Sequence, residues 1–336
     1  MVKKHDSADG AEWEPGWGRP ADASAAPTGR FPRRAALAAL AGLAAVPLTG
    51  CAGRNGPAEG AKSSVAVSGP VLAAADTGRA FAALEKEFAA RLGVFAVDTG
   101  SGRTVLHRPD ERFAYASTCK AFIAAAVLRK FSLREMQRRV TYGREVLQPH
   151  SPITERHVGK GKGMTLSELC DATVRYSDNA AANLLFDELG GPRGLQTELR
   201  SVGDRVTRCD RYEIELSDAV PGDPRDTSTA RALATDLRTY VLGNVLPPEK
   251  RAVLTDWLKR NTTGDHVIRA GTPDGWQVGD KTGTGGYGTR NDIAIVWRPD
   301  AAPIAIAVLS RKDVKGAEHQ DALIARAAEV ALNAFA

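Results

Sequence analysis

The chain is poor in aromatic residues and in cysteine, and both shortages limit what it can be. Phe, Trp and Tyr make up 6% of its 336 residues, so the core is expected to be aliphatic. Only four cysteines occur, and none of them forms a Cys-x-x-Cys pair. We therefore predict neither a metal site nor a disulfide framework, and expect Cys119, Cys170 and Cys209 to be small buried apolar groups. No metal ion or organic cofactor is predicted.

Charge of one sign is also scarce. The 45 Lys and Arg residues are nearly balanced by 40 Asp and Glu residues, which leaves a formal net charge of +5. The charges are scattered, whereas a nucleic-acid-binding protein concentrates positive charge on one face. We therefore predict no nucleic-acid partner. Mild basicity favours anionic small molecules, and the simpler alternative is a solvated surface of mixed charge. The abundance of Ala, Gly, Arg, Asp and Pro is typical of a GC-rich bacterial coding sequence.

Long apolar runs are missing except near the N-terminus. Arg33 and Arg34 precede the apolar run 35–48, and Cys51 follows Leu-Thr-Gly. This order predicts an export signal over residues 1–51, too short to span a membrane, and the paired arginines are compatible with twin-arginine export.

Cys51 is a predicted lipid-attachment site. Leu-Thr-Gly-Cys resembles a bacterial lipobox, in which the cysteine receives a lipid; the alternative is ordinary cleavage nearby, with Cys51 incidental. Residues 52–76 are rich in Ala, Gly, Ser and Pro and predict a flexible tether. The protein is therefore expected to be exported, and either anchored to the cell membrane by lipid or secreted.

Residues 77–336 form the predicted catalytic domain, whose N-terminal part starts with a helix. Apolar residues at helical spacing predict a helix over 79–92, ended by Gly93. Alternating residues then predict strands at 94–98 and 104–107, joined as a hairpin by a glycine-rich turn.

The C-terminal part repeats this combination of strands and helix. Strands are predicted at 292–297 and 303–310, followed by a helix over 321–335. We predict an α+β fold in which both ends of the domain build one antiparallel sheet with flanking helices. This α/β lobe comprises 77–110 and 258–336, and residues 111–257 form an all-helical lobe, with a cleft between the two.

Ser117 and Lys120 are the first candidate catalytic pair. They start an apolar run with helical character and lie three positions apart, so the amine of Lys120 can reach the hydroxyl of Ser117. The alternative is a helix cap beside a surface lysine. A lysine inside Lys-Ala-Phe-Ile-Ala-Ala is hard to place at a surface, which favours an activated serine nucleophile.

Ser177-Asp178-Asn179 precedes a second helical run, 180–189. Ser, Asp and Asn are also the preferred N-cap residues, so the segment predicts a cap, a functional site, or both with Asp178 as the structural member.

A third signature, Lys281-Thr282-Gly283, follows a predicted strand. A glycine-rich stretch with a lysine can cradle phosphate, but the G-x-x-x-x-G-K-[ST] order is missing.

Glu213 supplies the carboxylate that the other signatures lack. A covalent acyl-enzyme persists unless a base activates a water molecule beside the ester, and a carboxylate on a loop can do so. The alternative is an ordinary acidic residue in a charged loop. None of the signatures contains a His, which argues against a Ser-His-Asp triad.

Ser-x-x-Lys, Ser-Asp-Asn and Lys-Thr-Gly in this order are the signature set of class A β-lactamases and penicillin-binding proteins. The chain resembles a class A serine β-lactamase from about Thr77 to its C-terminus. The resemblance implies a β-lactamase/transpeptidase-like fold and a monomer. It also implies hydrolysis of the β-lactam amide of penicillins and cephalosporins, with antibiotic resistance as the result.

The resemblance assigns roles to the signature residues. Ser117 is the nucleophile, Lys120 or Glu213 accepts its proton, Ser177 protonates the leaving nitrogen, and Glu213 directs deacylation. The backbone N–H groups of Ser117 and Thr284 form the oxyanion hole. The remaining residues implied to bind substrate are Asn179, Lys281, Thr282, Gly283, Thr284, Arg290 and, as a wall of the cleft, His150.

An Ω-loop closed by Arg211 and Asp226 is implied to hold Glu213. The chain departs from the family at Ile214, where Pro is usual, and at Ser217, where Asn usually helps hold the hydrolytic water. A Ser reaches less far and has fewer donors, so we expect it to hold this water less firmly and to slow deacylation.

Related proteins often join the position of Cys170 to the position of Ala124 by a disulfide, so that bridge is not expected here.

Two rival functions stay open on sequence alone. A penicillin-binding D,D-peptidase shares three of the four signatures but lacks a deacylating glutamate on such a loop. A membrane-tethered penicillin sensor binds covalently without turnover, and it needs an effector or transmembrane segment that the sequence after the signal does not predict.

Overall fold

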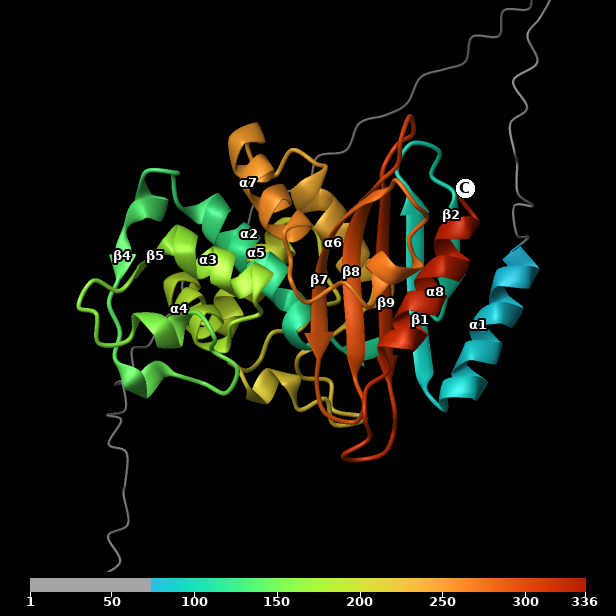
Figure 1. Ribbon diagram of the computed structural model, residues 1–336, viewed down its shortest axis with the longest axis horizontal. Helices are drawn as coiled ribbons and strands as arrows, with labels where there is room; N and C mark the ends of the chain where they lie inside the picture. The colour runs from blue at the N-terminus through green and yellow to red at the C-terminus, as the bar shows by residue number, and fades with distance from the viewer. Residues whose placement is uncertain (1–73) are drawn as a thin grey trace, which may run out of the picture. The chain divides into compact units, whose positions relative to one another are not determined.

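The computed structural model describes residues 74–336 (Figure 1). The export signal, Cys51 and nearly all of the predicted tether lie outside the described residues. The helices are α1 Ala74–Phe88, α2 Lys120–Lys130, α3 Leu166–Arg175, α4 Asn179–Leu189, α5 Pro192–Ser201, α6 Ala230–Val241, α7 Pro248–Lys259 and α8 Asp321–Asn333. The strands are β1 Arg91–Asp98, β2 Thr104–His107, β3 Arg112–Ala114, β4 Arg139–Val140, β5 Met164–Thr165, β6 Thr227–Thr229, β7 Gln277–Thr284, β8 Arg290–Trp297 and β9 Ile304–Arg311.

Five strands form one antiparallel sheet in the order β2-β1-β9-β8-β7. Strand β1, near the start of the domain, pairs along its whole length with β9, near the end, with Arg91 opposite Arg311 and Asp98 opposite Ile304. The predicted hairpin β1–β2 and the strands β8 and β9 are confirmed, as is the sheet built from both ends of the domain.

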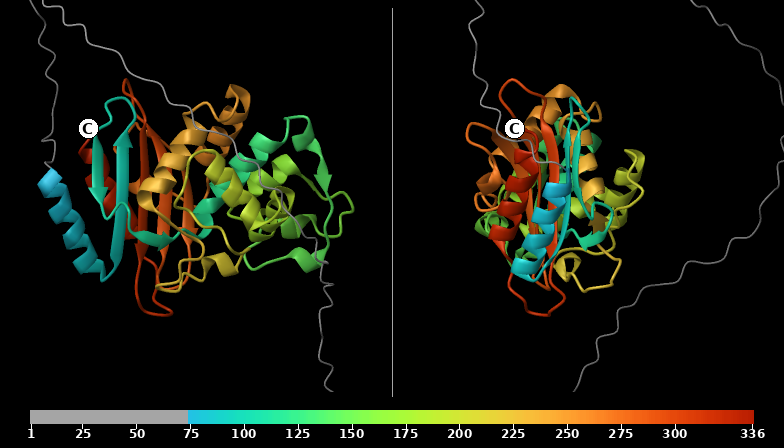
Figure 2. Two further views of the ribbon diagram at one scale, coloured as in Figure 1. Left: turned by 180° about the vertical axis from the view of Figure 1, so that it is seen from behind. Right: turned by 90° about the vertical axis from the view of Figure 1, so that its right-hand side faces the viewer.

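Both faces of this sheet are buried. Successive residues of a strand point to opposite faces, so Val94 and Ala96 pack with α1 and α8, whereas Phe95 and Val97 belong to the larger core shared with the helical lobe. Figure 2 shows α1 and α8 side by side on one face. Helix α6 packs against β1, β8 and β9 on the other face, and so joins the helical segment to the sheet.

The first helix ends earlier than predicted, at Phe88, and Gly93 lies inside β1. Helical and strand periodicity coincide over this short apolar run, which is why the sequence pattern misplaced the boundary. The glycine has a packing role, because a Cβ atom there would lie 2.6 Å from the ring of Phe113.

The helical lobe is built around α2, on which every residue from Lys120 to Leu128 is buried. Helices α3, α4, α5 and α7 pack around it. The prediction that 111–257 is all-helical needs one correction, because the short pairs β3–β6 and β4–β5 lie within it. They are only two or three residues long, too short to show alternation in the sequence.

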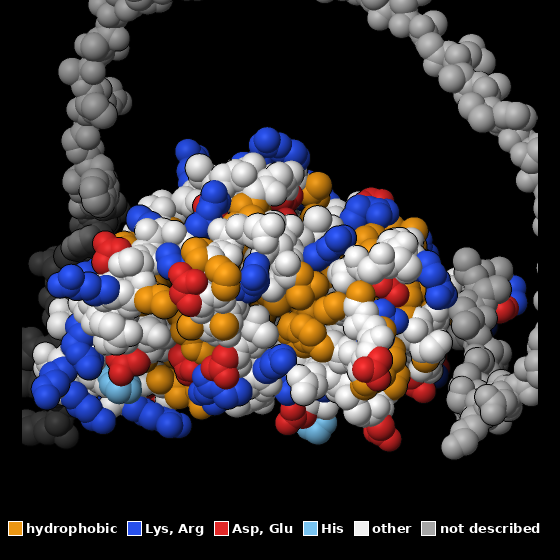
Figure 3. Space-filling model, turned by 90° about the horizontal axis from the view of Figure 1, so that it is seen from above, with side chains coloured by type: hydrophobic (Ala, Val, Ile, Leu, Met, Phe, Trp, Pro, Cys, Tyr) orange, Lys and Arg blue, Asp and Glu red, His pale blue; other side chains and the backbone are white. Residues whose placement is uncertain are grey.

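The described part of the chain contains no helix long and apolar enough to cross a membrane. Figure 3 shows one face of the molecule, on which Lys and Arg side chains are interspersed with Asp and Glu around an apolar centre. Cys119, Cys170 and Cys209 are buried free thiols, as expected.

Candidate active site

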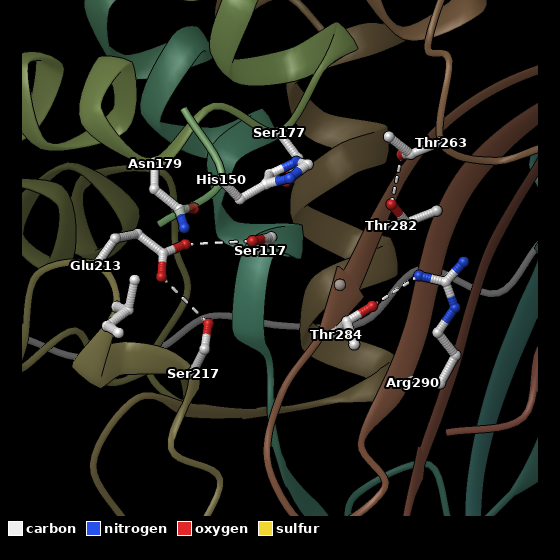
Figure 4. A pocket seen from close by; sticks show the side chains of 12 residues that line it. Ser117, His150, Ser177, Asn179, Glu213, Ser217, Thr263, Thr282, Thr284 and Arg290 are labelled. Atoms are coloured by element: carbon white, nitrogen blue, oxygen red, sulfur yellow. Dashed lines mark hydrogen bonds between the residues drawn. The ribbon is translucent and has the colours of Figure 1, made fainter. Parts of the chain in front are cut away.

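All four sequence signatures meet at one cavity of about 340 Å³ between the lobes. Figure 4 shows Ser117, Asn179, Glu213 and Ser217 on one side of it and Thr282, Thr284 and Arg290 on the other. The first group comes from α2's leading turn, α4 and the loop before β6, and the second comes from β7 and β8. The structure therefore brings together residues up to 173 positions apart, from Ser117 to Arg290.

Ser117 lies in a 3₁₀ turn, Ala116–Cys119, that leads directly into α2. The preceding Ala116 has a φ of +48°, which is strained for a residue with a Cβ atom. Strand β7 passes very close to this turn: a Cβ atom on Gly283 would lie 2.8 Å from the Tyr115 carbonyl oxygen. Gly283 thus allows the strand edge to approach the serine.

Lys120 is completely buried beside Ser117. Its Nζ lies 3.0 Å from Ser117 Oγ, which confirms the pairing predicted from their spacing. It also donates to the Ser177 carbonyl oxygen at 2.9 Å and to Asn179 Oδ1, and lies 2.9 Å from Glu213 Oε1. A carbonyl, an amide oxygen and a carboxylate around one amine form the environment of an ammonium group.

Glu213, on the loop before β6, also contacts Ser117. Ser117 Oγ donates to its Oε1 at 3.2 Å, and Ser217 Oγ donates to its Oε2 at 3.2 Å. The backbone of Glu213 is held by Asn183, whose side chain accepts from its N–H at 2.9 Å and donates to its carbonyl at 2.8 Å. The peptide bond to Ile214 is cis. The hydrogen bond from Ser117 places the Glu213 carboxylate in direct contact with the nucleophile.

The loop that carries Glu213, residues 211–226, is closed as the resemblance implied. Arg211 Nε donates to Asp226 Oδ2 at 2.6 Å, and the fully buried Asp226 also accepts from the backbone of Asp210 and Arg211. A second arm of Arg211 reaches Asp218 at 2.7 Å. Because a charge-assisted bond and backbone bonds converge on one carboxylate, Asp226 fixes both ends of the loop.

Ser177 and Asn179 flank a structural aspartate. Asp178 is the N-cap of α4, accepting from Ala181, and it also accepts from the backbone of Ile153 and Thr154. Ser177 has a φ of +56°, which leaves its Oγ between Lys120 Nζ at 3.4 Å and Lys281 Nζ at 3.2 Å. The segment is therefore both a cap and part of the site.

Lys281 is buried on β7 and donates to Ser177 Oγ and the Thr282 carbonyl oxygen. Burial and, to a smaller extent, the charge of Lys120 lower the pKa of Lys281 to about 7. Behind it, burial and the Asp280 carboxylate raise the pKa of Asp292 well above its usual range. Lys281 is thus a cation whose charge changes near neutral pH.

Arg290 is the second cation of this wall. It donates to Thr284 Oγ1 at 2.8 Å and to Asp321 Oδ1 at 2.6 Å, and it lines the cavity although it is 93% buried. Together with Lys281 it gives the β7 side of the cleft the charge needed to bind an anionic group.

His150 lines the cavity opposite β7, as a wall residue should. It has a φ of +58°, and its Nε2 lies 3.0 Å from the Tyr176 carbonyl oxygen, which tethers the ring to the start of the Ser177 segment.

Three site residues were not predicted from the sequence. Asn183 holds Glu213, Thr263 shares a 2.6 Å hydrogen bond with Thr282 Oγ1, and Ile214 lines the cavity. Asn183 lies one helical turn after Asn179, a spacing that could have indicated it. Thr263 lies in an ordinary polar turn, which gave no signal.

Cys119, next to Ser117 in the chain, points into the core. Burial raises the pKa of its thiol well above the usual range, so the sulfur stays protonated and is no rival nucleophile. Within residues 74–336, no group of three or more His, Cys, Asp or Glu side chains could hold a metal ion.

The chain is similar to known proteins over nearly the whole described region. The sequence profile of the beta-lactamase enzyme family matches residues 77–335. A beta-lactamase of Bacillus amyloliquefaciens is 55% identical over 257 residues, covering 76% of this chain and 83% of the relative. Beta-lactamase 1 of Streptomyces cacaoi is 48% identical over 313 residues, covering 88% of this chain and 95% of the relative. Among solved structures, a class A beta-lactamase from Clostridium kluyveri matches with a TM-score of 0.75 and 48% identity, covering 77% of this chain and 98% of that one.

Proposed function

Because this chain belongs to the beta-lactamase enzyme family, and is a class A serine β-lactamase, we propose a specific role for each polar group in its cleft. The enzyme hydrolyses the β-lactam amide through a serine acyl-enzyme, which gives resistance to these antibiotics. One observation supports the assignment of roles more than any other: Glu213 Oε1 contacts both Ser117 Oγ, at 3.2 Å, and Lys120 Nζ, at 2.9 Å.

Acylation uses Ser117 as the nucleophile. Its Oγ bonds to the β-lactam carbonyl carbon while its proton passes to Glu213, because the contacts of Lys120 are those of an ammonium, which has no lone pair to receive it. The carbonyl oxygen becomes an oxyanion, bound by the backbone N–H groups of Ser117 and Thr284. Ser177 then donates its proton to the ring nitrogen as the C–N bond breaks, and regains one from Lys120. Glu213 passes the serine proton on to Lys120 across their 2.9 Å contact, which restores both the ammonium and the free carboxylate.

Deacylation uses Glu213 again. A water molecule between Glu213 and the ester loses a proton to the carboxylate and attacks the ester carbon, and the proton finally returns to Ser117 Oγ as the bond to serine breaks. Ser217 donates to the second oxygen of Glu213 and occupies the position from which that water is oriented.

Substrate binding uses the opposite wall. Thr282 and Arg290, which line the cavity, bind the carboxylate of the β-lactam, and Thr263 fixes the hydroxyl of Thr282. The fully buried Lys281 attracts the same carboxylate through its charge. Asn179 binds the amide of the substrate side chain. The donor for this contact is Asn179 Nδ2, which in the structure donates to the Pro149 carbonyl oxygen at 2.7 Å.

The nucleophile assignment is tested by mass spectrometry. After incubation with a slowly hydrolysed β-lactam, we expect one adduct, located on Ser117. Ser117→Ala should lose both the adduct and turnover, whereas Ser201→Ala, which changes an exposed serine of α5, should lose neither. Full turnover by Ser117→Ala would rule out this role.

A chromogenic cephalosporin then separates acylation from turnover. The wild type should release one equivalent of chromophore per enzyme in a fast burst, which reports acylation. Hydrolysis should then continue at a steady rate. A stoichiometric burst without turnover would be the behaviour of a penicillin sensor or peptidase and would contradict the roles given to Glu213.

We also propose that Cys51 carries a lipid that holds the enzyme at the membrane. The support is the Leu-Thr-Gly-Cys sequence together with the preceding apolar run and the following Gly, Ala and Ser-rich stretch. Cys51→Ala should move the activity from the membrane fraction to the medium. Wild-type activity found entirely in the soluble fraction would refute the anchor.

A further inference from the structure

A second cavity of about 280 Å³ lies behind the loop that carries Glu213. Its walls are the second half of that loop, strand β3, and residues at the β7–β8 turn and the end of β9. We call it the rear pocket. It is close in size to the catalytic cavity and near the lower end of the range of about 300–1,000 Å³ usual for ligand sites, so it suits a small molecule.

The rear pocket contains a buried hydroxyl that has no partner within residues 74–336. Thr289 is only 1% exposed, lines this pocket, and its Oγ1 makes no hydrogen bond with any described residue. Buried polar groups are nearly always hydrogen-bonded, and leaving one unpaired is unfavourable. An acceptor atom of a ligand in the pocket would satisfy it.

The charges around the pocket leave one positive charge in excess. Arg225 is paired with Asp223 at 2.7 Å. Arg311 is paired with Asp313 and lies 3.6 Å from Glu111, whose closer partner is Arg91 at 2.6 Å. Arg112, the third arginine, bonds only to the oxygens of Thr227 and Val206 and has no carboxylate partner among the described residues. The charged side chains around the rear pocket therefore carry one more positive than negative charge, which an anionic ligand would balance.

The rest of the wall is apolar. Ala114, Ala219, Val220, Pro221 and Pro224 line the pocket, and Val220 is 44% exposed. Inorganic phosphate would leave this surface uncovered, and most guanidinium donors nearby are already bound. We propose that the rear pocket binds a small monocarboxylate with an apolar body, the carboxylate near Arg112 and Thr289 and the body against Val220 and Pro221.

Occupation of the rear pocket has a direct route to the active site. The Gly286 N–H, in the turn beside Thr289, donates to the Ser217 carbonyl oxygen at 2.9 Å, and Ser217 in turn bonds to Glu213. The cavity is present with Glu213 in contact with Ser117, so a ligand that fits it stabilises this arrangement of the loop. This second step rests on the role proposed for Glu213, whereas binding itself does not.

Binding is tested with benzoate as the probe and benzyl alcohol as its uncharged counterpart. Benzoate should raise the thermal midpoint of the wild type in a concentration-dependent way, with millimolar affinity, and benzyl alcohol should not. In crystals soaked with 4-iodobenzoate, the anomalous iodine peak should lie in the rear pocket.

Three variants locate the effect. Arg112→Gln and Thr289→Val should each weaken benzoate binding by about tenfold, the loss expected for one hydrogen bond to a charged group. Thr289→Val keeps the shape of the side chain and removes only the unpaired hydroxyl, so it should fold normally. Arg193→Gln, on the exposed surface of α5, is the matched control and should bind benzoate as the wild type does.

The outcomes are decisive in both directions. Benzoate binding that is unchanged in Arg112→Gln and Thr289→Val, or an iodine peak only in the catalytic cavity, would overturn the proposal. So would equal stabilisation by benzyl alcohol or by inorganic phosphate.

The coupling is tested in Asp226→Asn, in which the loop has lost its anchor. Benzoate should restore part of the deacylation rate of that variant, by at least twofold, and should raise its acylation rate by less. Benzoate binding without such a rescue would overturn the coupling to the active site, while the proposal that the rear pocket binds a monocarboxylate would stand. Failure of Glu213 as the base would instead be seen in benzoate-free enzyme.

Discussion

Two halves of the catalytic centre are held in different ways. Ser117 and Lys120 lie where a 3₁₀ turn enters the buried helix α2, and Lys281 lies in the middle of the β7–β8 ladder. Glu213 and Ser217 lie on the loop 211–226, whose regular structure is limited to one 3₁₀ turn, Glu215–Ser217. Backbone hydrogen bonds fix the first half, whereas side chains such as Asn183 and Asp226 fix the second.

This difference separates the two chemical steps. Acylation needs the nucleophile, the oxyanion donors and the cations, most of which lie on helix and strand. Glu213 is the base in both steps, but deacylation depends in addition on a water molecule that this loop carboxylate and Ser217 must hold to within a fraction of an ångström. Substitutions in the loop should therefore impair deacylation more than acylation.

The largest expected effect comes from Glu213→Ala. Removal of the general base should slow deacylation by about 10²–10⁴-fold, and acylation should remain measurable because the oxyanion donors stay in place. Rapid-quench mass spectrometry should show the adduct accumulating. Glu215→Ala, an exposed carboxylate two residues further along the same loop, is the control and should hydrolyse normally. Unchanged hydrolysis by Glu213→Ala would place the base elsewhere.

Asp226→Asn tests the anchor of the loop. The uncharged amide replaces a buried carboxylate that accepts from Arg211 and from two backbone N–H groups, so stability should fall by about 2–4 kcal/mol. Deacylation should fall by more than acylation, as pre-steady-state kinetics would reveal. Asp218→Asn removes only the outer, half-exposed partner of Arg211 and should have a much smaller effect. If Asp226→Asn slowed acylation and deacylation equally, the loop would not act mainly on deacylation, and the comparison between the two halves would be wrong.

Substrate binding on the β7 side of the cleft should depend on pH through Lys281. Lys281 has a pKa lowered to about 7, so it is charged below that pH and neutral above it. The attraction for a substrate carboxylate should therefore weaken as pH rises, with KM increasing about tenfold between pH 6 and 8. Lys281→Arg keeps its charge and should flatten this profile. A pH-independent KM in the wild type would contradict the prediction.

Buried ionisation also affects folding. Partial neutrality of Lys281 in the folded protein means that the unfolded chain binds more protons between about pH 7 and 10.5, so this lysine makes stability rise with pH across that window. Lys281→Met should remove this contribution, and denaturant midpoints at pH 6, 8 and 10 would measure it. Lys86→Met, on the exposed surface of α1, serves as the comparison.

The smallest expected effect comes from Ser217→Asn. The longer amide side chain reaches further and offers two donors, so it should hold the hydrolytic water better and raise the deacylation rate by a few-fold. Single-turnover decay of the acyl-enzyme gives this rate directly. A slower decay would mean that Ser217 suits the loop better as it stands.

The residues predicted best from the sequence lie on regular elements with fixed spacing. Lys120 reaches Ser117 because both follow one helical path, and β7 carries Lys281 to Gly283 along one strand. The register of helix and strand determines such neighbours without knowledge of the rest of the fold.

The residues missed depend on tertiary contacts. Thr263 reaches Thr282 only because a turn after α7 folds back on β7, and Asn183 matters only because the loop lies over α4. The position of Gly93 in β1 likewise depends on the ring of Phe113, 20 residues away. The helical spacing from Asn179 places Asn183 on the same face of α4, but no local pattern identifies its partner or those of Thr263 and Gly93, since each contact joins segments that are separated in the chain.

The pairing of β1 with β9 has a consequence for how the chain reaches this structure. Arg91 can meet Arg311 only after the intervening chain has been made, so the centre of the sheet is among the last regions whose partners are all available. The entropy lost in closing so long a loop grows only slowly with length, by about 0.6 kcal/mol per doubling, and burdens stability little. The cost falls on kinetics, because folding rates decline as contacts become less local. Until β9 arrives, β1 has one unpaired edge, and the β1–β2 hairpin is therefore the segment most exposed to mispairing while the helices around α2 can already assemble.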